Sequence, residues 1–438
     1  MIGSGIAGLS AAWLLSKNQD VTLFEKSGYI GGHAHTVDIT LEDKKFPVDT
    51  GFIVFNPVNY PNLTALFEHL QVTTDKTDMS FAVSLDDGAF EYSGGDGGGL
   101  LAQPSNILKP RFWAMLQGIV RFYGKAEHYC SDPSFTHMSL GELLATEGYR
   151  SAFIRDHLAP MGAAIWSSNS ADILDYPAAD FLNFFRNHGL VQLSNRPEWR
   201  TVRGGSRQYI QRLTSSFRNN IRVNCAVQSV ARTSDGVRVL TSDGRAETYN
   251  EVIFACHSDQ ALRLIEEPAP DLRHSLTHLG YSANTVVLHT DETLMPQRKK
   301  AWASWNYIER RMPDAAGPAV SYWMNRLQNL PVQTPIIVTL NPDREIKPEN
   351  ILGEYEYDHP IFDQQASIAR RQLWQLQGRH HMWFAGAYLG HGFHEDGIQA
   401  GLTIAELLGS SRRPWFRSGQ NERIGQDDTA YLPRRNAA

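Results

Sequence analysis

Hydrophobic positions in this chain follow both helical and strand spacings, and the two alternate along the sequence. Between residues 106 and 187 apolar side chains recur at intervals of three and four, as at Phe112 and Met115, which predicts helices. Residues 81–85 alternate and lead into an Asp-Asp-Gly turn, which predicts a hairpin. Residues 252–256 are apolar without a break, as in a parallel strand buried on both faces. Together these segments predict an α/β protein.

The chain begins with a glycine-rich turn that opens a helix. Its first motif reads Gly3-Ser4-Gly5-Ile6-Ala7-Gly8 and precedes an apolar helix. In a G-x-G-x-x-G turn, backbone N–H groups at a helix N-terminus can bind a diphosphate. Gly3 would allow the tight turn, Gly5 the approach of the phosphate, and Gly8 close packing of helix on strand. The next strand ends at Glu25, at the right spacing for the ribose of an adenosine, so the sequence predicts a dinucleotide site.

Only Met1 and Ile2 precede this motif, which normally follows a buried strand of about five residues. The first strand of the predicted sheet is therefore largely missing. Because that strand would lie in the middle of a doubly wound sheet, we expect unpaired backbone groups on both neighbouring strands. We also expect the true start of the protein to lie upstream.

Composition narrows the function classes. A length of 438 residues suggests two domains or one interleaved pair. A net charge of −6 argues against a nucleic-acid-binding protein, and no run of about twenty apolar residues is long enough to cross a membrane. The three scattered cysteines, Cys130, Cys225 and Cys256, contain no C-x-x-C pair. These cysteines are typical of a protein in the reducing cytoplasm and do not suggest a disulfide framework. A peripheral membrane contact through exposed aromatic residues remains an open alternative.

Later motifs carry a resemblance to a known superfamily. Gly31-Gly32-His33 precedes a strand that contains threonine, Gly51 interrupts the strand 46–55, and a strand, loop and helix follow one another over residues 382–408. In these features the chain resembles flavin amine oxidases, protoporphyrinogen oxidases and phytoene-type desaturases. Over nearly its whole length it is similar to a bacterial group of FAD/NAD-binding proteins in that superfamily, as in the phrase His391-Gly392-Phe393-His394.

The resemblance implies a Rossmann-like FAD-binding domain of the p-hydroxybenzoate hydroxylase/amine oxidase type, interleaved with an α+β substrate domain. The FAD-binding domain would comprise residues 1–75, 201–267 and 380–410. The substrate domain would comprise residues 76–200, helical over 106–187, and residues 268–379. Residues 411–438 are polar and are expected to form a flexible tail.

FAD is the cofactor that this resemblance implies. The expected cofactor contacts are Gly3, Ser4, Gly5, Ala7, Gly8, Glu25, Lys26, Gly31, Gly32, His33, Gly51, Val227, Gly386, Asp396 and Gly397. His33 stands where the superfamily has an arginine, and Ala387 follows Gly386 where it has an acid. A simple bend in the strand is an equal alternative for Gly51. The N-terminus of the last helix would face the flavin and stabilise its anionic reduced form.

The sequence predicts an FAD-dependent oxidoreductase that takes a hydride from an apolar lipid-like or amine substrate. Electrons would pass to oxygen or a quinone-like acceptor, because a second G-x-G-x-x-G for NAD(P)H is absent. A catalytic residue is not identified: no lysine matches the flavin-facing lysine of amine oxidases, and Lys299 and Lys300 are left as candidates.

Three alternatives stay open. The protein could bind flavin or a dinucleotide without catalysis, or it could be an inactive, N-terminally shortened form. The pair His33 and His35, or the group around His394 and Glu395, could instead bind a metal, but neither supplies a full set of ligands. No metal site is therefore predicted.

Overall fold

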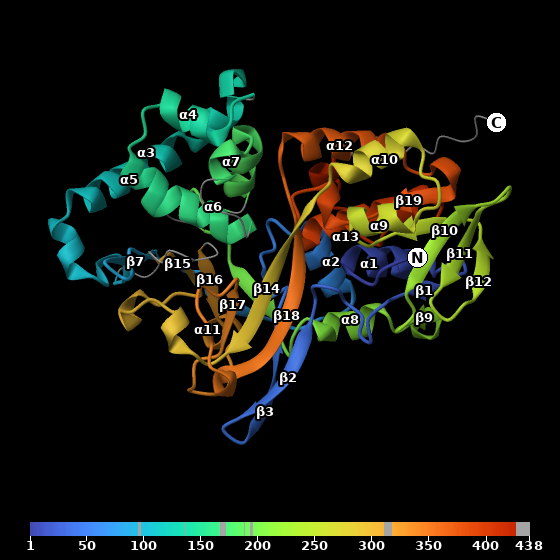
Figure 1. Cartoon of the computed structure of the whole chain (residues 1–438), viewed down its shortest axis with the longest axis horizontal. Coiled ribbons are helices and arrows are strands. Elements are labelled where there is room, and N and C mark those ends of the chain that lie inside the picture. The colour runs from blue at the N-terminus through green and yellow to red at the C-terminus, as the bar shows by residue number, and fades with distance from the viewer. Residues whose placement is uncertain are drawn as a thin grey trace.

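The chain folds into two lobes that two long strands connect (Figure 1). The computed structural model describes residues 1–94, 98–135, 137–166, 172–187, 189–192, 196–310 and 318–425. Strands β14 (Tyr281–His289) and β18 (Ile351–Pro360) pair antiparallel along their whole length and run between the lobes (Figure 1).

The first lobe, here called the parallel-sheet lobe, is built on short parallel strands. Strand β1 pairs with β9, and β13 pairs with β19. Ile2 bridges Phe24 on one side and Phe254 on the other. The strands are β9 (Ile221–Arg222), β1 (Leu23–Phe24), β13 (Val252–Phe254) and β19 (Met382–Phe384).

The first strand of this sheet is represented by one bridge residue, yet the neighbouring strands are paired there. Ile2 N donates to Ile253 O, and Gly3 N donates to Phe24 O, each at 2.9 Å. In return, Phe24 N and Ala255 N donate to the first two residues of the chain. Residues 1–3 therefore pair with both neighbours where the sequence led us to expect unpaired groups.

Helices and a meander complete the parallel-sheet lobe. Helices α1 and α13 lie against each other so closely that a Cβ on Gly401 would overlap Ala7 O. The helices of this lobe include α1 (Ile6–Leu15), α2 (Pro61–His69), α8 (Arg207–Leu213), α9 (Ser258–Leu264) and α13 (His394–Leu407). The antiparallel meander consists of β10 (Val227–Arg232), β11 (Val237–Thr241) and β12 (Ala246–Tyr249).

The second lobe is built on a mixed sheet of seven strands in the order β18-β14-β17-β16-β15-β6-β7. Only the β15–β6 pair of this sheet is parallel. The hairpin predicted at residues 81–85 is confirmed, because β6 pairs antiparallel with β7. The further strands are β6 (Phe81–Leu85), β7 (Phe90–Gly94), β15 (Trp305–Ile308), β16 (Ala319–Trp323) and β17 (Ile337–Leu340).

Helices cover this sheet and share its core, as the spacing of apolar residues over 106–187 predicts. Phe122, Phe153 and Phe181 are fully buried there. The helices are α3 (Pro110–Ser131), α4 (Leu140–Thr146), α5 (Ser151–Phe153), α6 (Ala159–Trp166) and α7 (Ala178–Asn187). Two further segments of the sequence, the glycine-rich tract 94–99 and residues 160–167, lie partly outside the described residues.

Two small sheets and a short helix lie where the lobes meet. Strands β2 (Thr36–Leu41) and β3 (Lys44–Asp49) form a hairpin that projects from the molecule (Figure 1). Strand β8 (Trp199–Val202) pairs with both β4 (Val54–Phe55) and β5 (Thr74–Thr77). Helix α11 (Met324–Gln328) follows β16.

The two ends of segment 268–379 pack in a different core from its middle. Leu272 of α10 (Pro270–Thr277) and Leu373 of α12 (Gln364–Gln375) share a core with Phe254 of the parallel sheet. The middle of the segment forms the seven-stranded sheet. The segment expected to belong to the substrate domain therefore begins and ends in the parallel-sheet lobe.

Residues 411–425 do not form the flexible tail that their polar composition predicts. The Arg413 guanidinium pairs with the Glu406 carboxylate at 2.9 Å and is almost fully buried. Trp415 stacks on Trp13 of α1, with ring centroids 5.9 Å apart. A buried ion pair and a stacked ring fix this segment, and composition alone does not reveal either partner. Residues 426–438 lie outside the described part of the chain.

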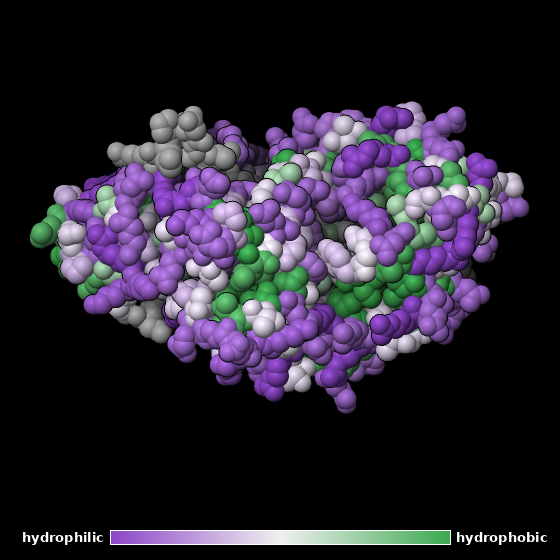
Figure 2. Space-filling view, turned by 60° about the horizontal axis from the view of Figure 1, so that its bottom comes forward, coloured by the Kyte–Doolittle hydropathy of each residue, from purple (hydrophilic) through white to green (hydrophobic). Residues whose placement is uncertain are grey.

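Within the described ranges, no helix has both the length and the apolar character needed to cross a membrane. Figure 2 shows one face on which most residues are hydrophilic and hydrophobic residues gather toward the middle.

Candidate flavin site

The turn at residues 3–8 brings three glycines together, and each has a different surrounding. Gly3 has φ +103°, and a Cβ there would lie 2.6 Å from Ala255 O. A Cβ on Gly8 would overlap Gly3 O. Both positions therefore require glycine for the fold, as the motif predicts.

Gly5 differs from the other two glycines. It has φ −66° and ψ 177°, which any L-residue adopts. No described heavy atom lies within 4 Å of a Cβ built there. Among the residues that the structure describes, no side chain caps α1, so its first N–H groups face the space beside Gly5. This space suits an anion that the helix N-terminus would bind.

Glu25 lies at the end of β1 and contacts the turn directly. Its Oε2 accepts hydrogen bonds from Ser4 N at 3.0 Å and Ser4 Oγ at 2.6 Å, and its Oε1 accepts from Ser27 N. A carboxylate accepts about four hydrogen bonds, so acceptor capacity is left for a ribose hydroxyl. Lys26 is exposed beside it.

Val227 begins β10 close to this end of the turn. Cys225 N, two residues earlier, donates to Glu25 O at 2.9 Å. The structure therefore places the predicted adenine contact beside the predicted ribose contact.

Residues 31–33 form a second layer over the turn. Gly31 N donates to Ser4 O at 3.0 Å, and a Cβ on Gly32 would lie 3.1 Å from Gly5 Cα. Gly51 lies against the same segment, because its Cβ would overlap His33 O. Gly51 therefore allows two backbone segments to approach each other.

The His33 side chain lies among other rings. Its ring centroid is 5.0 Å from that of Tyr357 and 5.7 Å from that of His359, both on β18, and 6.5 Å from that of His257. Burial and, to a smaller extent, the nearby His359, His257 and His394 together lower the pKa of His33 to about 3. Its Nε2 is buried and has no hydrogen-bond partner among the described residues. His33 is therefore a neutral group with one free hydrogen-bonding atom.

The start of α13 completes the site. A Cβ on Gly397 would lie 2.7 Å from Ile6 Cγ2, so the first turns of α13 and α1 are in contact. Gly386 ends the loop after β19, and the Gly397 Cβ would lie 3.9 Å from the next backbone nitrogen, Ala387 N. His394 stacks on Phe52 at 3.9 Å between ring centroids.

Two buried carboxylates lie in the first turn of α13. Asp396 Oδ2 accepts from Phe393 N at 2.7 Å. Glu395 accepts from Asn62 N and Leu63 N, both at 3.1 Å, and so caps α2. Burial raises the pKa of Glu395. The capping of α2 by Glu395 is not foreseen from the sequence, because the partners of Glu395 lie more than 330 residues away along the chain.

Asp49 joins the two lobes beside this site, and sequence reasoning missed it. Its carboxylate accepts from Ser206 N at 2.9 Å, from Ser206 Oγ at 2.7 Å and from Gln328 Nε2 at 2.7 Å. Burial raises the pKa of Asp49 to about 6, against the lowering effect of these hydrogen bonds. The signal in the sequence was its position, two residues before Gly51.

Several other candidate groups lie outside this site or have structural partners. Lys299 and Lys300 are exposed on a short helix, η8 (Lys299–Ala301), and Lys299 pairs with Glu292 at 2.8 Å.

Among the described residues, no group of three or more His, Cys, Asp and Glu is arranged to bind a metal ion. Burial raises the pKa of Cys256 to about 12.

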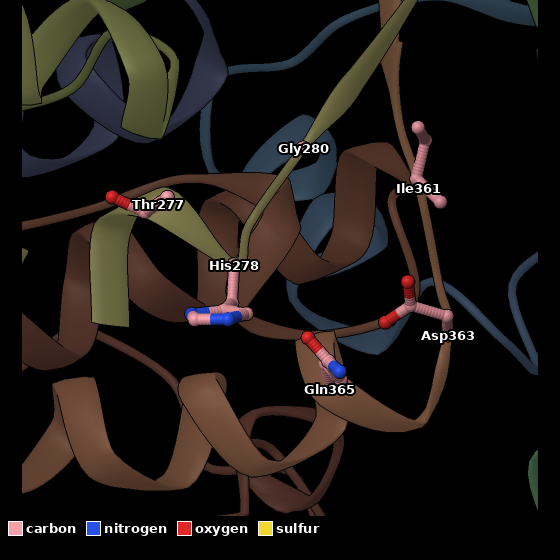
Figure 3. Close-up of a pocket in the computed structure, with 6 residues that line it drawn as sticks. All are labelled: Thr277, His278, Gly280, Ile361, Asp363 and Gln365. Carbon is pink, nitrogen blue, oxygen red and sulfur yellow. The ribbon is translucent and has the colours of Figure 1, made fainter. Parts of the chain in front are cut away.

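A small surface pocket of about 190 Å³ lies between α10 and the loop before α12 (Figure 3). Its lining residues include His278, Gly280 and Asp363. None of the predicted cofactor contacts lines it, so it is not part of the candidate site.

Most of the chain matches one protein-family model. Residues 6–352 match the model described as flavin containing amine oxidoreductase. The chain belongs to this family. The match begins at residue 6, within the glycine turn and at the start of α1, and it covers most of the chain.

Solved structures of several other proteins have a similar fold. The CLA-producing fatty acid isomerase from P. acnes has a TM-score of 0.64 at 15% identity, over 93% of this chain and 96% of the isomerase. Cyclohexylamine oxidase from Brevibacterium oxydans IH-35A has a TM-score of 0.64 at 13% identity, over 93% and 98%. Putrescine oxidase bound to putrescine has a TM-score of 0.63 at 14% identity, over 93% and 97%. Curated protein sequences give no match.

The residues present fit a flavin dinucleotide. The space at Gly5 and the N–H groups of α1 lie at the same turn, and Gly31 and Gly32, the two residues before His33, pack against it. The buried Nε2 of His33 has no hydrogen-bond partner among the described residues. Glu25 keeps acceptor capacity at one end of it.

Proposed function

We propose that this protein is an FAD-dependent oxidoreductase that takes a hydride from an apolar lipid-like or amine substrate. Electrons would leave to oxygen or a quinone-like acceptor. The observation that carries the proposal is the open space at Gly5, a glycine that the fold itself does not require. Membership of a flavin-containing family supports the same conclusion.

In this proposal the turn and its neighbours hold FAD. The N–H groups of α1 bind the diphosphate, Glu25 binds the ribose and Val227 lies against the adenine. Residues 31–33, Gly51 and the loop from Gly386 to Gly397 border the flavin. Bound FAD would supply the acceptor for the substrate hydride. The two lobes correspond to an FAD-binding domain and a substrate domain, with the chain crossing between them near residues 75 and 200.

The names of proteins with a similar fold support two substrate classes for this protein. One is named a fatty acid isomerase, and the other two are named putrescine oxidase and cyclohexylamine oxidase. The neutral imidazole of His33 and the rings around it would form a weakly polar wall that suits either class. We place the protein in the cytoplasm, which its three free cysteines support.

A substitution at Gly5 tests the cofactor assignment. Gly5→Val adds side-chain atoms to a space that no described atom fills, so the chain should fold normally. The same atoms would occupy the position of the diphosphate, and flavin affinity should fall at least about tenfold. The measurements are the flavin absorbance of the purified protein and its thermal unfolding without cofactor. Full retention of flavin by Gly5→Val would refute the assignment.

Catalysis is tested separately from binding. The flavin-loaded protein is mixed without oxygen with long-chain fatty acids and with mono- and diamines, and loss of the flavin absorbance is followed. Bleaching by one class identifies the substrate class. A protein that binds flavin stoichiometrically but is bleached by neither class, and by no further hydride donor, would be the non-catalytic binding protein.

A further inference from the structure

Exposed hydrophobic residues are concentrated in one stretch of the second lobe. Among the described residues thirteen large hydrophobic side chains are exposed, and six of them lie between residues 100 and 120. Leu108 is 85% exposed and Trp113 is 55% exposed. We call this set the exposed apolar face: Leu100, Leu101, Ile107, Leu108, Trp113 and Val120.

The exposed apolar face belongs to ordered elements. It comprises the short helices η1 (Gly99–Leu101) and η2 (Pro104–Leu108) and the first part of α3. Trp113 Nε1 donates to Ile107 O at 2.9 Å, so the polar atom of the indole is satisfied while its ring faces solvent. Trp113 and Val120 are seven residues apart and share one face of α3. Figure 1 places this segment at one end of the molecule, and Figure 2 shows hydrophobic residues protruding at that end.

Charge around this face is positive, although the whole chain carries −6. Residues 98–126 contain no Asp or Glu and four cations, Lys109, Arg111, Arg121 and Lys125. The last three pair with acids of neighbouring segments, Asp86, Asp156 and Glu147. The Lys109 Nζ instead contacts Ala89 O and Asn106 Oδ1, which are both uncharged. Helix η8, which packs against η1, adds the exposed Lys300, whereas its Lys299 pairs with Glu292 at 2.8 Å.

We propose that the exposed apolar face docks on an anionic lipid bilayer. Leucine, isoleucine and tryptophan side chains would enter the interface between headgroups and acyl chains, and Lys109 and Lys300 would contact anionic headgroups. A second copy of this chain fits less well, because a stable protein interface uses about 20–30 residues on each side. This inference is independent of the cofactor and of the reaction.

Vesicle flotation tests the proposal with the full chain. The protein is mixed with phosphatidylcholine vesicles or with vesicles that also contain phosphatidylglycerol. We expect binding to the anionic vesicles, reduced by salt, and at least about tenfold weaker binding of the Leu101→Gln/Leu108→Gln variant. Phe416→Gln is the matched control, because Phe416 is exposed on the C-terminal segment and should not affect binding.

Insertion is tested by fluorescence. Quenching of tryptophan emission by brominated phosphatidylcholine in the anionic vesicles should fall strongly in Trp113→Phe, while flotation persists. Equal binding of the wild type and the Leu101→Gln/Leu108→Gln variant would overturn the proposal. So would a wild type that stays unbound to both vesicle types. A concentration-dependent dimer that the double variant abolishes, without vesicle binding, would assign this face to a second copy instead.

Discussion

Helices α1 and α13 begin side by side at the candidate flavin site, but their first turns differ in charge. Helix α1 begins Ile-Ala-Gly and has no acidic residue in its first turn. Helix α13 begins His-Glu-Asp, and both carboxylates are buried. A helix N-terminus attracts anions through its N–H groups, and a carboxylate in the first turn offsets that attraction. Two neighbouring helix N-termini therefore differ in what they can bind.

Because of this difference, the N-terminus of α1 is suited to bind an anion, whereas the N-terminus of α13 makes contacts that stabilise the fold. The N–H groups of α1 remain available beside Gly5, whereas Asp396 accepts from Phe393 N within α13. Glu395 serves another helix, because it caps α2 through Asn62 and Leu63. The positive contribution to the flavin that the sequence analysis assigned to α13 is therefore reduced by its own acids, and α1 is the stronger anion site.

The largest effect is expected from Gly8→Ala in α1. The added Cβ would overlap Gly3 O and lie 3.0 Å from Ala255 Cβ, and the surrounding backbone cannot move without breaking the sheet. We expect a loss of about 3 kcal/mol or more in the free energy of unfolding, measured by urea denaturation. Gly124→Ala is the control: Gly124 is exposed in α3, and no described heavy atom is near its Cβ. It should gain about 0.5–1 kcal/mol, and equal losses in both variants would contradict this explanation.

In α13, Glu395→Ala should cost somewhat less. It leaves the N–H groups of Asn62 and Leu63 buried without their acceptor, at a cost of about 2–3 kcal/mol. Glu395→Gln keeps one acceptor oxygen and should cost less than the alanine variant. Urea denaturation measures both variants. If glutamine is as damaging as alanine, the charge of Glu395 matters rather than its capping of α2.

Sequence reasoning identified the glycine turn from its motif and, through the family resemblance, distant positions such as Gly397, but it did not identify the side chains that surround them. The spacing of the motif alone predicts Gly3 and Gly8, although a Cβ on Gly3 would meet Ala255, more than 250 residues away along the chain. The ring neighbours of His33 come from β18, more than 320 residues away, and no periodicity reveals them. Arg413 shows a different limit: its partner Glu406 is only seven residues away, but the polar composition of this segment does not reveal that the pair is buried.

Asp49 is a buried carboxylate that belongs to neither helix N-terminus, so it can be compared with the two carboxylates of α13. Its folded pKa of about 6 lies above the ordinary value of 3.8, so the folded state holds this proton more tightly than the unfolded state. Its contribution to stability is fully present below pH 4 and is lost as the pH rises to about 6. We expect about 2–3 kcal/mol over that range, a change that should be missing in Asp49→Asn. Urea denaturation between pH 4 and 7 measures it, and parallel profiles for the two proteins would contradict it.

The smallest and most specific effect is expected from Asp396→Asn. Asparagine can still accept from Phe393 N, so the cap persists, but the Arg423 guanidinium, 3.6 Å from Asp396 Oδ1, loses its anionic neighbour. The free energy of unfolding should therefore fall by about 1–2 kcal/mol. Removing the fixed negative charge strengthens the positive N-terminus of α13 toward the bound flavin. The midpoint potential should therefore rise, by about 10–20 mV for a two-electron couple. Equilibration with a redox dye measures it. Asp363→Asn is the matched control, since Asp363 caps α12 outside the site through Ala366 N. An unchanged potential in Asp396→Asn would mean that α13 does not face the flavin, and the contrast between the two helices would then concern the fold alone.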